Sequence, residues 1–181
     1  MRNQMILFGW ITLLVFPIPG FCLQYYFNQT SFLDFIAFDD FRMIPLLYGL
    51  QIGIVYGFIA YLFMKAPFFE KVPVKINKLV RNMKLSVFDG LFLSLCAGIG
   101  EELLFRQGIQ SFTGVLLTSV LFVALHGYLN PFSLRFSVYG LIVLPFIILI
   151  SYGLDVFGIW FCIAAHFSYD AVLFTFMLKE D

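Results

Sequence analysis

The chain has 181 residues, of which 61% are hydrophobic and only 12% are charged. The mean hydropathy of +0.94 lies far above that of an ordinary soluble domain. The formal net charge is zero, so there is no excess of basic residues to neutralise a run of phosphates, and no nucleic-acid partner is expected. The composition therefore excludes an ordinary soluble protein and predicts an all-α, multi-pass protein of the lipid bilayer.

Two apolar segments are predicted in the first 85 residues. The first, at about 5–27, is interrupted by Pro17 and Pro19. We expect a retained helix kinked at these prolines, rather than a cleaved signal peptide, because the apolar character resumes beyond them and no small-residue cleavage pattern follows. The second segment, 45–64, carries glycines at every fourth position, which predicts close packing against another helix.

The segment 65–84 holds six basic residues and one acidic residue. Positively charged loops stay in the cytoplasm, so we expect this segment and both termini to be cytoplasmic and to contact anionic lipid. The acidic loop 28–43 is then expected on the outer side.

Residues 86–181 are predicted to form a core of four helices, at about 86–110, 114–128, 133–150 and 156–178. The predicted turns are 111–114, Asn130-Pro131 and 151–155, which are short and rich in polar residues, glycine or proline. With the two earlier segments this gives a bundle of about six helices.

Several ionisable residues lie inside these apolar helices, where a charge is costly and usually functional. Counted from the predicted outer turns at about 1.5 Å per residue, Glu101 and His166 lie about 16 Å deep. His126 and Asp170 lie about 21 and 22 Å deep by the same count. In a hydrocarbon core of about 30 Å, three helices therefore place their polar groups in one layer.

Two adjacent carboxylates in this layer are expected to differ in role. Glu102 and Arg106 are four residues apart, so they can form a buried pair. Glu101 points about 100° away around the helix and remains free to act as a general base on water. The structural alternatives are that the pair only stabilises the fold, and that each histidine only binds a backbone carbonyl.

The spacing of these residues resembles the signature of the CPBP family of intramembrane proteases, also called the Abi or CAAX-protease-like family, which includes CAAX prenyl endopeptidases of the Rce1 type. Its Glu-Glu-x-x-x-Arg motif is matched at Glu101 to Arg106. Its Phe-x-x-x-His motif is matched by Phe122 and His126. Its His-x-x-x-Asn or Asp motif is matched by His166 and Asp170, and the resemblance covers about residues 86–175.

The resemblance implies hydrolysis of a peptide bond by water that Glu101 activates and His126 holds. It also implies that His166 and Asp170 stabilise the oxyanion or orient its donor, and that Glu102 and Arg106 support the site. Because an ionised carboxylate cannot donate a hydrogen bond, we expect Asp170 to accept from His166 and fix its tautomer, or to be protonated.

Some alternatives stay open at this point. The site is expected to work without a cofactor, but zinc held by Glu101, His126 and His166 is the alternative. The substrate is expected to be a prenylated (CAAX-type) or other lipidated protein, or a leader peptide, in a bacterial cell membrane. A proton-coupled transporter or channel and a non-catalytic bacteriocin-immunity protein are the competing functions.

Overall fold

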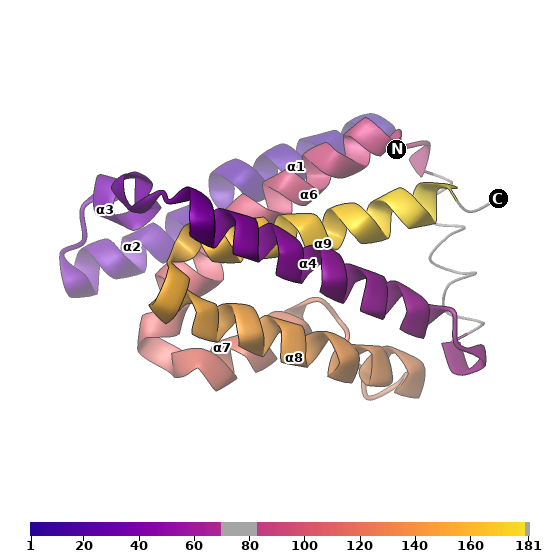
Figure 1. Cartoon of the computed structure of the whole chain (residues 1–181). Coiled ribbons are helices and arrows are strands. Elements are labelled where there is room, and N and C mark those ends of the chain that lie inside the picture. Colours follow the sequence, from indigo (N-terminus) through magenta and orange to yellow (C-terminus); the bar gives the residue numbers. More distant parts are fainter. Residues whose placement is uncertain (70–82, 180–181) are drawn as a thin grey trace.

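The computed structural model describes residues 1–69 and 83–179, and this part of the chain is helical with no strand (Figure 1). Most of the predicted basic segment lies outside the described residues. The elements in chain order are α1 (Arg2–Val15), α2 (Pro17–Asn28), α3 (Phe32–Ile36), η1 (Phe38–Asp40), α4 (Met43–Met64), η2 (Pro67–Phe69), α6 (Val87–Glu102), η3 (Leu103–Ile109), α7 (Gln110–Leu125), α8 (Leu134–Phe157) and α9 (Ile159–Lys179).

Five helical stretches in the described residues are long and apolar enough to cross a membrane. One of them, Arg2–Asn28, joins α1 and α2 end to end at Pro17, as the prolines predict. Another, Val87–Leu125, joins α6, η3 and α7, but Gly114 breaks it with φ 74° and ψ 168°. The third and fourth predicted helices are therefore separate segments. The five apolar helical stretches confirm the predicted all-α membrane bundle.

The predicted turn at 151–155 is wrong. Helix α8 continues to Phe157, and the chain turns at Gly158, whose φ of 81° favours glycine. Ser151 stays helical because it is fully buried and its hydroxyl lies 3.1 Å from that of Ser119. His166 consequently lies about 12 Å beyond its outer turn, rather than about 16 Å.

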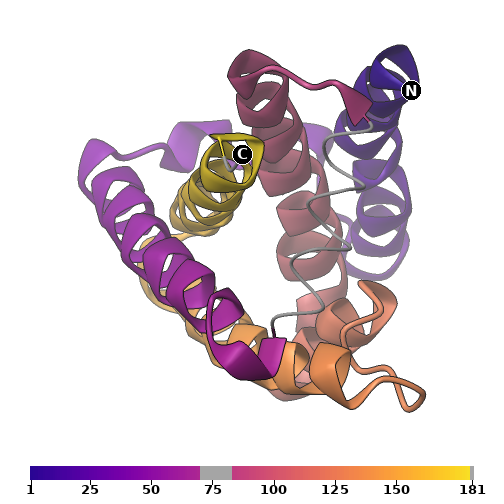
Figure 2. The ribbon, with the colours of Figure 1, turned by 90° about the vertical axis from the view of Figure 1, so that its right-hand side faces the viewer.

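Both described ends of the chain lie at one end of the bundle, together with the end of α4 (Figures 1 and 2). Helix α3 lies at the opposite end (Figure 1). The two termini therefore share a side, as expected. The assignment of that side to the cytoplasm stays a prediction from the basic segment.

Helix α9 is packed tightly against α4. A Cβ atom on Gly53 would collide with the carbonyl oxygen of Ala165 and the hydroxyl of Ser168. Gly49 and Gly57 face the backbone of α9 in the same way, at Phe161 and Tyr169. The glycine stripe thus allows a close approach that fixes the rotation of α9, the helix that carries His166.

Candidate active site

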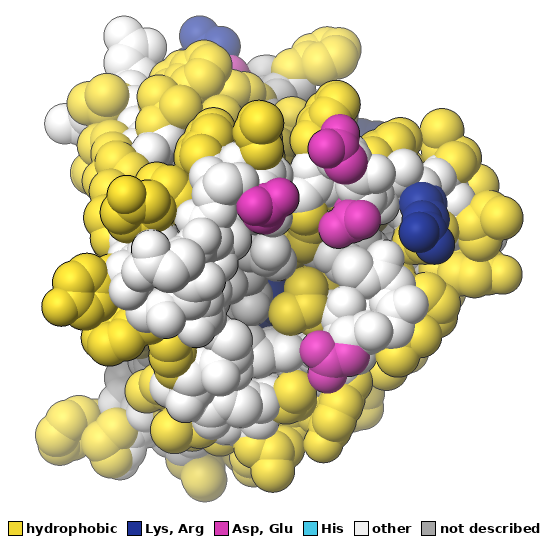
Figure 3. All heavy atoms as spheres, turned by 90° about the vertical axis from the view of Figure 1, so that its left-hand side faces the viewer, with side chains coloured by type: hydrophobic (Ala, Val, Ile, Leu, Met, Phe, Trp, Pro, Cys, Tyr) yellow, Lys and Arg dark blue, Asp and Glu magenta, His cyan; other side chains and the backbone are white. Residues whose placement is uncertain are grey.

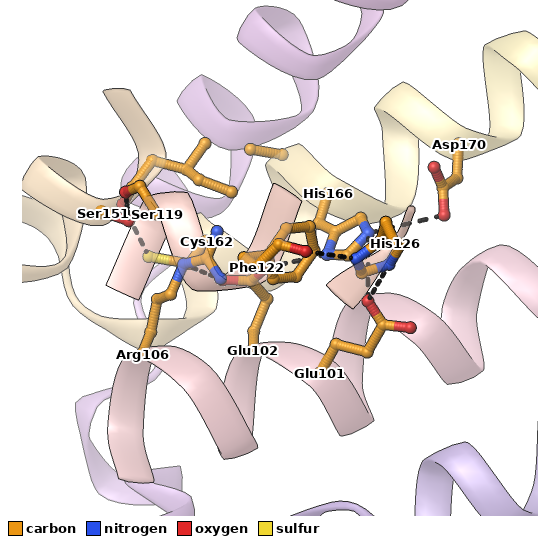
Figure 4. Close-up of polar contacts among 12 residues, drawn as sticks. Glu101, Glu102, Arg106, Ser119, Phe122, His126, Ser151, Cys162, His166 and Asp170 are labelled. Carbon is orange, nitrogen blue, oxygen red and sulfur yellow. Dashed lines mark hydrogen bonds and ion pairs between the residues drawn. The ribbon is translucent and has the colours of Figure 1, made fainter. Parts of the chain in front are cut away.

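The two adjacent glutamates lie where the α-helical geometry of α6 gives way to a π-helical turn, η3. Short π-helical stretches often occur at functional sites. Two glycines fit this bend against the N-terminal helices, because Gly100 faces the backbone of Thr12 and Gly108 faces that of Gly20. The bend places Glu101 and Glu102 in different surroundings (Figure 4).

Glu102 forms a fully buried pair with Arg106, as predicted. The Nε atom of Arg106 lies 3.0 Å from Oε2 of Glu102, and both side chains are 0% exposed. The other carboxylate oxygen, Oε1, lies 2.8 Å from Nδ1 of His166. The guanidinium carbon also lies 4.6 Å from the ring centre of Phe122, a cation–π contact. Glu102 thus joins the arginine of η3 to the histidine of α9.

The tautomer of His166 is set differently from our expectation. A carboxylate can only accept, so Nδ1 of His166 carries the proton that it donates to Glu102. Asp170 lies farther away, at 3.5 Å from Nε2 of the same ring. Glu102, rather than Asp170, is therefore the group that orients His166.

Glu101 faces both histidines. Its Oε2 atom lies 3.2 Å from Nε2 of His126 and 4.0 Å from Nε2 of His166. Nδ1 of His126 lies 2.8 Å from the carbonyl oxygen of Phe122, so this nitrogen is the donor. A direct bond between His126 and Glu101 then requires one shared proton, which makes the pair able to take up and release a proton.

A cavity of about 280 Å³ opens beside these groups. All four residues of the predicted layer line it, and they come from α6, the C-terminal end of α7, and α9 (Figure 4). The rest of the lining is mainly aromatic and aliphatic: Phe122, Tyr128, Val143, Phe146, Ile147, Tyr169 and Phe174. The site therefore has room for a polar reaction centre within apolar walls.

Tyr128 is a site residue that the motifs do not identify. It lines the cavity, and its ring centroid lies 6.0 Å from that of His126. Burial raises the pKa of this phenol above its ordinary value, so the hydroxyl keeps its proton and can donate a hydrogen bond. Its only sequence signal is its position two residues after His126.

Zinc, the alternative cofactor, would need side chains that still have a donor atom free to bind it. The Nδ1 atoms of His126 and His166 are already engaged by Phe122 and Glu102, which leaves the two Nε2 atoms and Glu101 as the donor set. Across residues 1–69 and 83–179, no group of three or more His, Cys, Asp or Glu side chains has the arrangement of a metal site. The metal-free expectation stays a prediction that a binding experiment must test.

One family model matches the chain. It describes the type II CAAX prenyl endopeptidase Rce1-like proteins and covers residues 83–172, a segment that contains all six predicted site residues. No curated protein and no solved structure matches the chain.

Proposed function

The chain belongs to the Rce1-like family of type II CAAX prenyl endopeptidases, and from that membership we propose that it cleaves a peptide bond with water activated by Glu101. The family supports an intramembrane protease, and the apolar helices make it an integral multi-pass membrane protein. The observation that carries the proposed mechanism is the position of Glu101, which faces a cavity and lies 3.2 Å from His126.

The proposed reaction begins with a water molecule held between Glu101 and His126. Glu101 removes a proton while the water oxygen bonds to the carbonyl carbon of the substrate. When the carbon–nitrogen bond breaks, Glu101 gives this proton to the leaving amine. The products are a carboxylic acid and an amine, so no other reactant is required.

The negative charge on the carbonyl oxygen needs hydrogen-bond donors in the cavity. The Tyr128 phenol can donate, and the Nε2 atom of His166 can do so when the ring is protonated. Asp170 in its ionised form cannot donate. We therefore assign the oxyanion to Tyr128 and His166. Asp170, which lies 3.5 Å from Nε2 of His166, favours the protonated form of that ring through its negative charge.

A second, apolar cavity supports a lipidated substrate. It has a volume of about 230 Å³ and shares Tyr128, Asp170 and Phe174 with the first cavity. Its remaining residues are mostly methionines, whose flexible side chains adapt to irregular apolar groups: Met5, Met64, Met83, Tyr139, Leu173 and Met177. We propose that it holds the lipid of a prenylated peptide while the scissile bond lies beside Glu101.

The test is cleavage of a prenylated CAAX peptide by purified protein in lipid nanodiscs, followed by mass spectrometry. We expect Glu101→Gln to lower kcat by about 10²–10⁴-fold, the usual contribution of a general base. Asp39→Asn, which removes an exposed carboxylate at the opposite end of the bundle, is the matched control and should leave kcat unchanged.

Persistence of cleavage in Glu101→Gln would refute the assigned base. Proton flux that depends on Glu101, without proteolysis, would instead favour the transporter. An unprenylated peptide of the same sequence tests whether the prenyl group contributes to cleavage. Equal cleavage of both peptides would contradict the proposal that the methionine-lined cavity holds the lipid.

Metal dependence is measured on the same preparation. We propose a reaction without zinc, so a chelator should leave the rate unchanged and elemental analysis should find no stoichiometric metal. Stoichiometric zinc with chelator-sensitive cleavage would contradict this mechanism and favour the ligand set Glu101, His126 and His166.

A further inference from the structure

A separate polar cavity of about 370 Å³ lies at the α3 end of the bundle. Its lining comes from α2, η3, α7 and the end of α8: Gln24, Arg106, Gln107, Gln110, Ser111, Gly114, Val115, Leu154 and Asp155. None of these residues lines the cavity beside Glu101. Figure 3 looks onto this end of the molecule and shows a hollow with part of a basic side chain visible inside it.

Two buried side chains of the lining have incomplete hydrogen bonding. The Nη1 and Nη2 atoms of Arg106 have no hydrogen-bond partner in the described part of the chain, although the side chain is 0% exposed. Gln110 is also buried; its Nε2 donates to the carbonyl oxygen of Ser151 at 2.9 Å, but its Oε1 has no partner there.

Leaving such groups unpaired inside a protein is unfavourable, and more so for a charged group than for a neutral one. The occupant of the cavity must therefore both accept from a guanidinium and donate to an amide oxygen.

The surrounding charges disfavour a free anion as this occupant. Glu102 already accompanies Arg106, and Asp155 is part of the lining. The nearby α3 and η1 add further carboxylates at Asp34, Asp39 and Asp40, and Figure 3 shows acidic side chains gathered on this face. Water can donate and accept, and at about 30 Å³ per molecule the volume holds on the order of ten molecules.

We propose that this cavity is an aqueous vestibule whose water molecules bind Arg106 and Gln110. It opens to the aqueous phase at the α3 end, while the buried Glu102–Arg106 pair separates it from the catalytic cavity. The guanidinium is then hydrated from one side and paired with Glu102 on the other. This arrangement explains how a charged arginine is kept within the apolar bundle.

The test measures whether a thiol in the vestibule reacts with a membrane-impermeant methanethiosulfonate reagent in lipid nanodiscs. Cys22 is exposed and is first replaced by serine, whereas Cys96 and Cys162 are buried. Gln107→Cys places a thiol in the lining. Leu121→Cys is the matched control, because it lies the same seven residues from Gly114 but on the exposed, lipid-facing surface.

We expect Gln107→Cys to react at least about tenfold faster than Leu121→Cys, because only a hydrated thiol ionises readily and a charged reagent is excluded from hydrocarbon. Equal rates would overturn the proposal. Adding Val115→Trp, which fills the cavity next to Gly114, should slow the reaction of Gln107→Cys about tenfold by removing water from that thiol.

An unchanged rate in the Val115→Trp variant would mean that the reagent reaches residue 107 by another route, and would also overturn the vestibule. Both readouts use the intact protein and need no substrate. Their outcome therefore does not depend on whether the protein is a protease.

Discussion

Glu101 and Glu102 are neighbours in sequence but belong to two different regions of the molecule. Glu101 lines an open cavity and its side chain is 13% exposed. Glu102 is 0% exposed and is held by Arg106 and His166 at 3.0 and 2.8 Å. The first carboxylate is therefore open to the cavity, as the proposed general base must be, whereas the second is fixed between two helices.

The largest effect on stability should come from breaking the buried ion pair of Glu102 and Arg106. Arg106→Met leaves the buried Glu102 carboxylate without its arginine and bonded only to His166, so we expect a loss of about 3–5 kcal/mol in the free energy of unfolding. Denaturant titration of the protein in detergent micelles measures it. Glu101→Gln, which keeps the volume of its side chain, should leave this free energy nearly unchanged.

The double variant Glu102→Leu/Arg106→Met removes both charges together. It should recover part, but not all, of the stability lost in Arg106→Met. The buried carboxylate that lacks its arginine is gone, but Nδ1 of His166 loses its acceptor. If Arg106→Met were as stable as the wild-type protein, the contrast between the two carboxylates would be lost.

The second prediction displaces α9, on which both regions depend. Gly53→Val would drive its side chain into the backbone of α9 at Ala165, next to His166. Overpacking of this kind costs about 1–3 kcal/mol, so we expect a lower melting temperature together with lower activity. Val55→Leu, on the exposed side of the same helix, is the control, and equal loss in both variants would contradict the packing argument.

The third prediction concerns only the cavity that Glu101 lines. Tyr128→Phe removes one proposed oxyanion donor and should lower kcat by about 10²-fold without lowering stability. Because burial raises the pKa of this tyrosine, its hydroxyl stays protonated as the pH rises through its ordinary range. The ratio of the wild-type kcat to the Tyr128→Phe kcat should therefore stay constant as the pH rises to about 10, the ordinary pKa of tyrosine. An unchanged kcat would exclude Tyr128 as a donor.

Spacing along the sequence was sufficient to predict the four polar residues that share a cavity and the buried ion pair beside them. Hydropathy located the helices, and counting depth brought Glu101, His126, His166 and Asp170 to one level, where they do line one cavity. The Glu102–Arg106 pair followed from its spacing of four residues. These features depend only on helical geometry, which the sequence pattern reports directly.

Features that depend on helix rotation could not be predicted in this way. The bond between Glu102 and His166 requires the rotation of α9 that the glycines of α4 set. Tyr128 lies in the turn after α7, where periodicity gives no direction for a side chain. The turn at Gly158 was misplaced because Ser151 and Asp155 resemble a polar break, although Ser151 is buried by a tertiary contact.

The smallest effect on stability should come from the ion pair of Arg2 and Asp89. Like the pair of Arg106 and Glu102 it joins an arginine to a carboxylate, but its arginine is exposed. Arg2 makes two contacts of 2.8 Å with Asp89 and thereby joins α1 to α6, but its side chain is 57% exposed. Arg2→Ala leaves Asp89 bonded to the backbone nitrogen and hydroxyl of Ser86. No buried charge is left without a partner.

We therefore expect Arg2→Ala to lower the melting temperature far less than Arg106→Met does. Salt should weaken the Arg2 contribution much more than the Arg106 contribution, because ions screen exposed pairs more than buried ones. Melting curves of both variants at low and high salt measure this difference. An equal loss in both variants would mean that burial does not set the strength of these pairs, and the distinction between Glu101 and Glu102 would then need another cause.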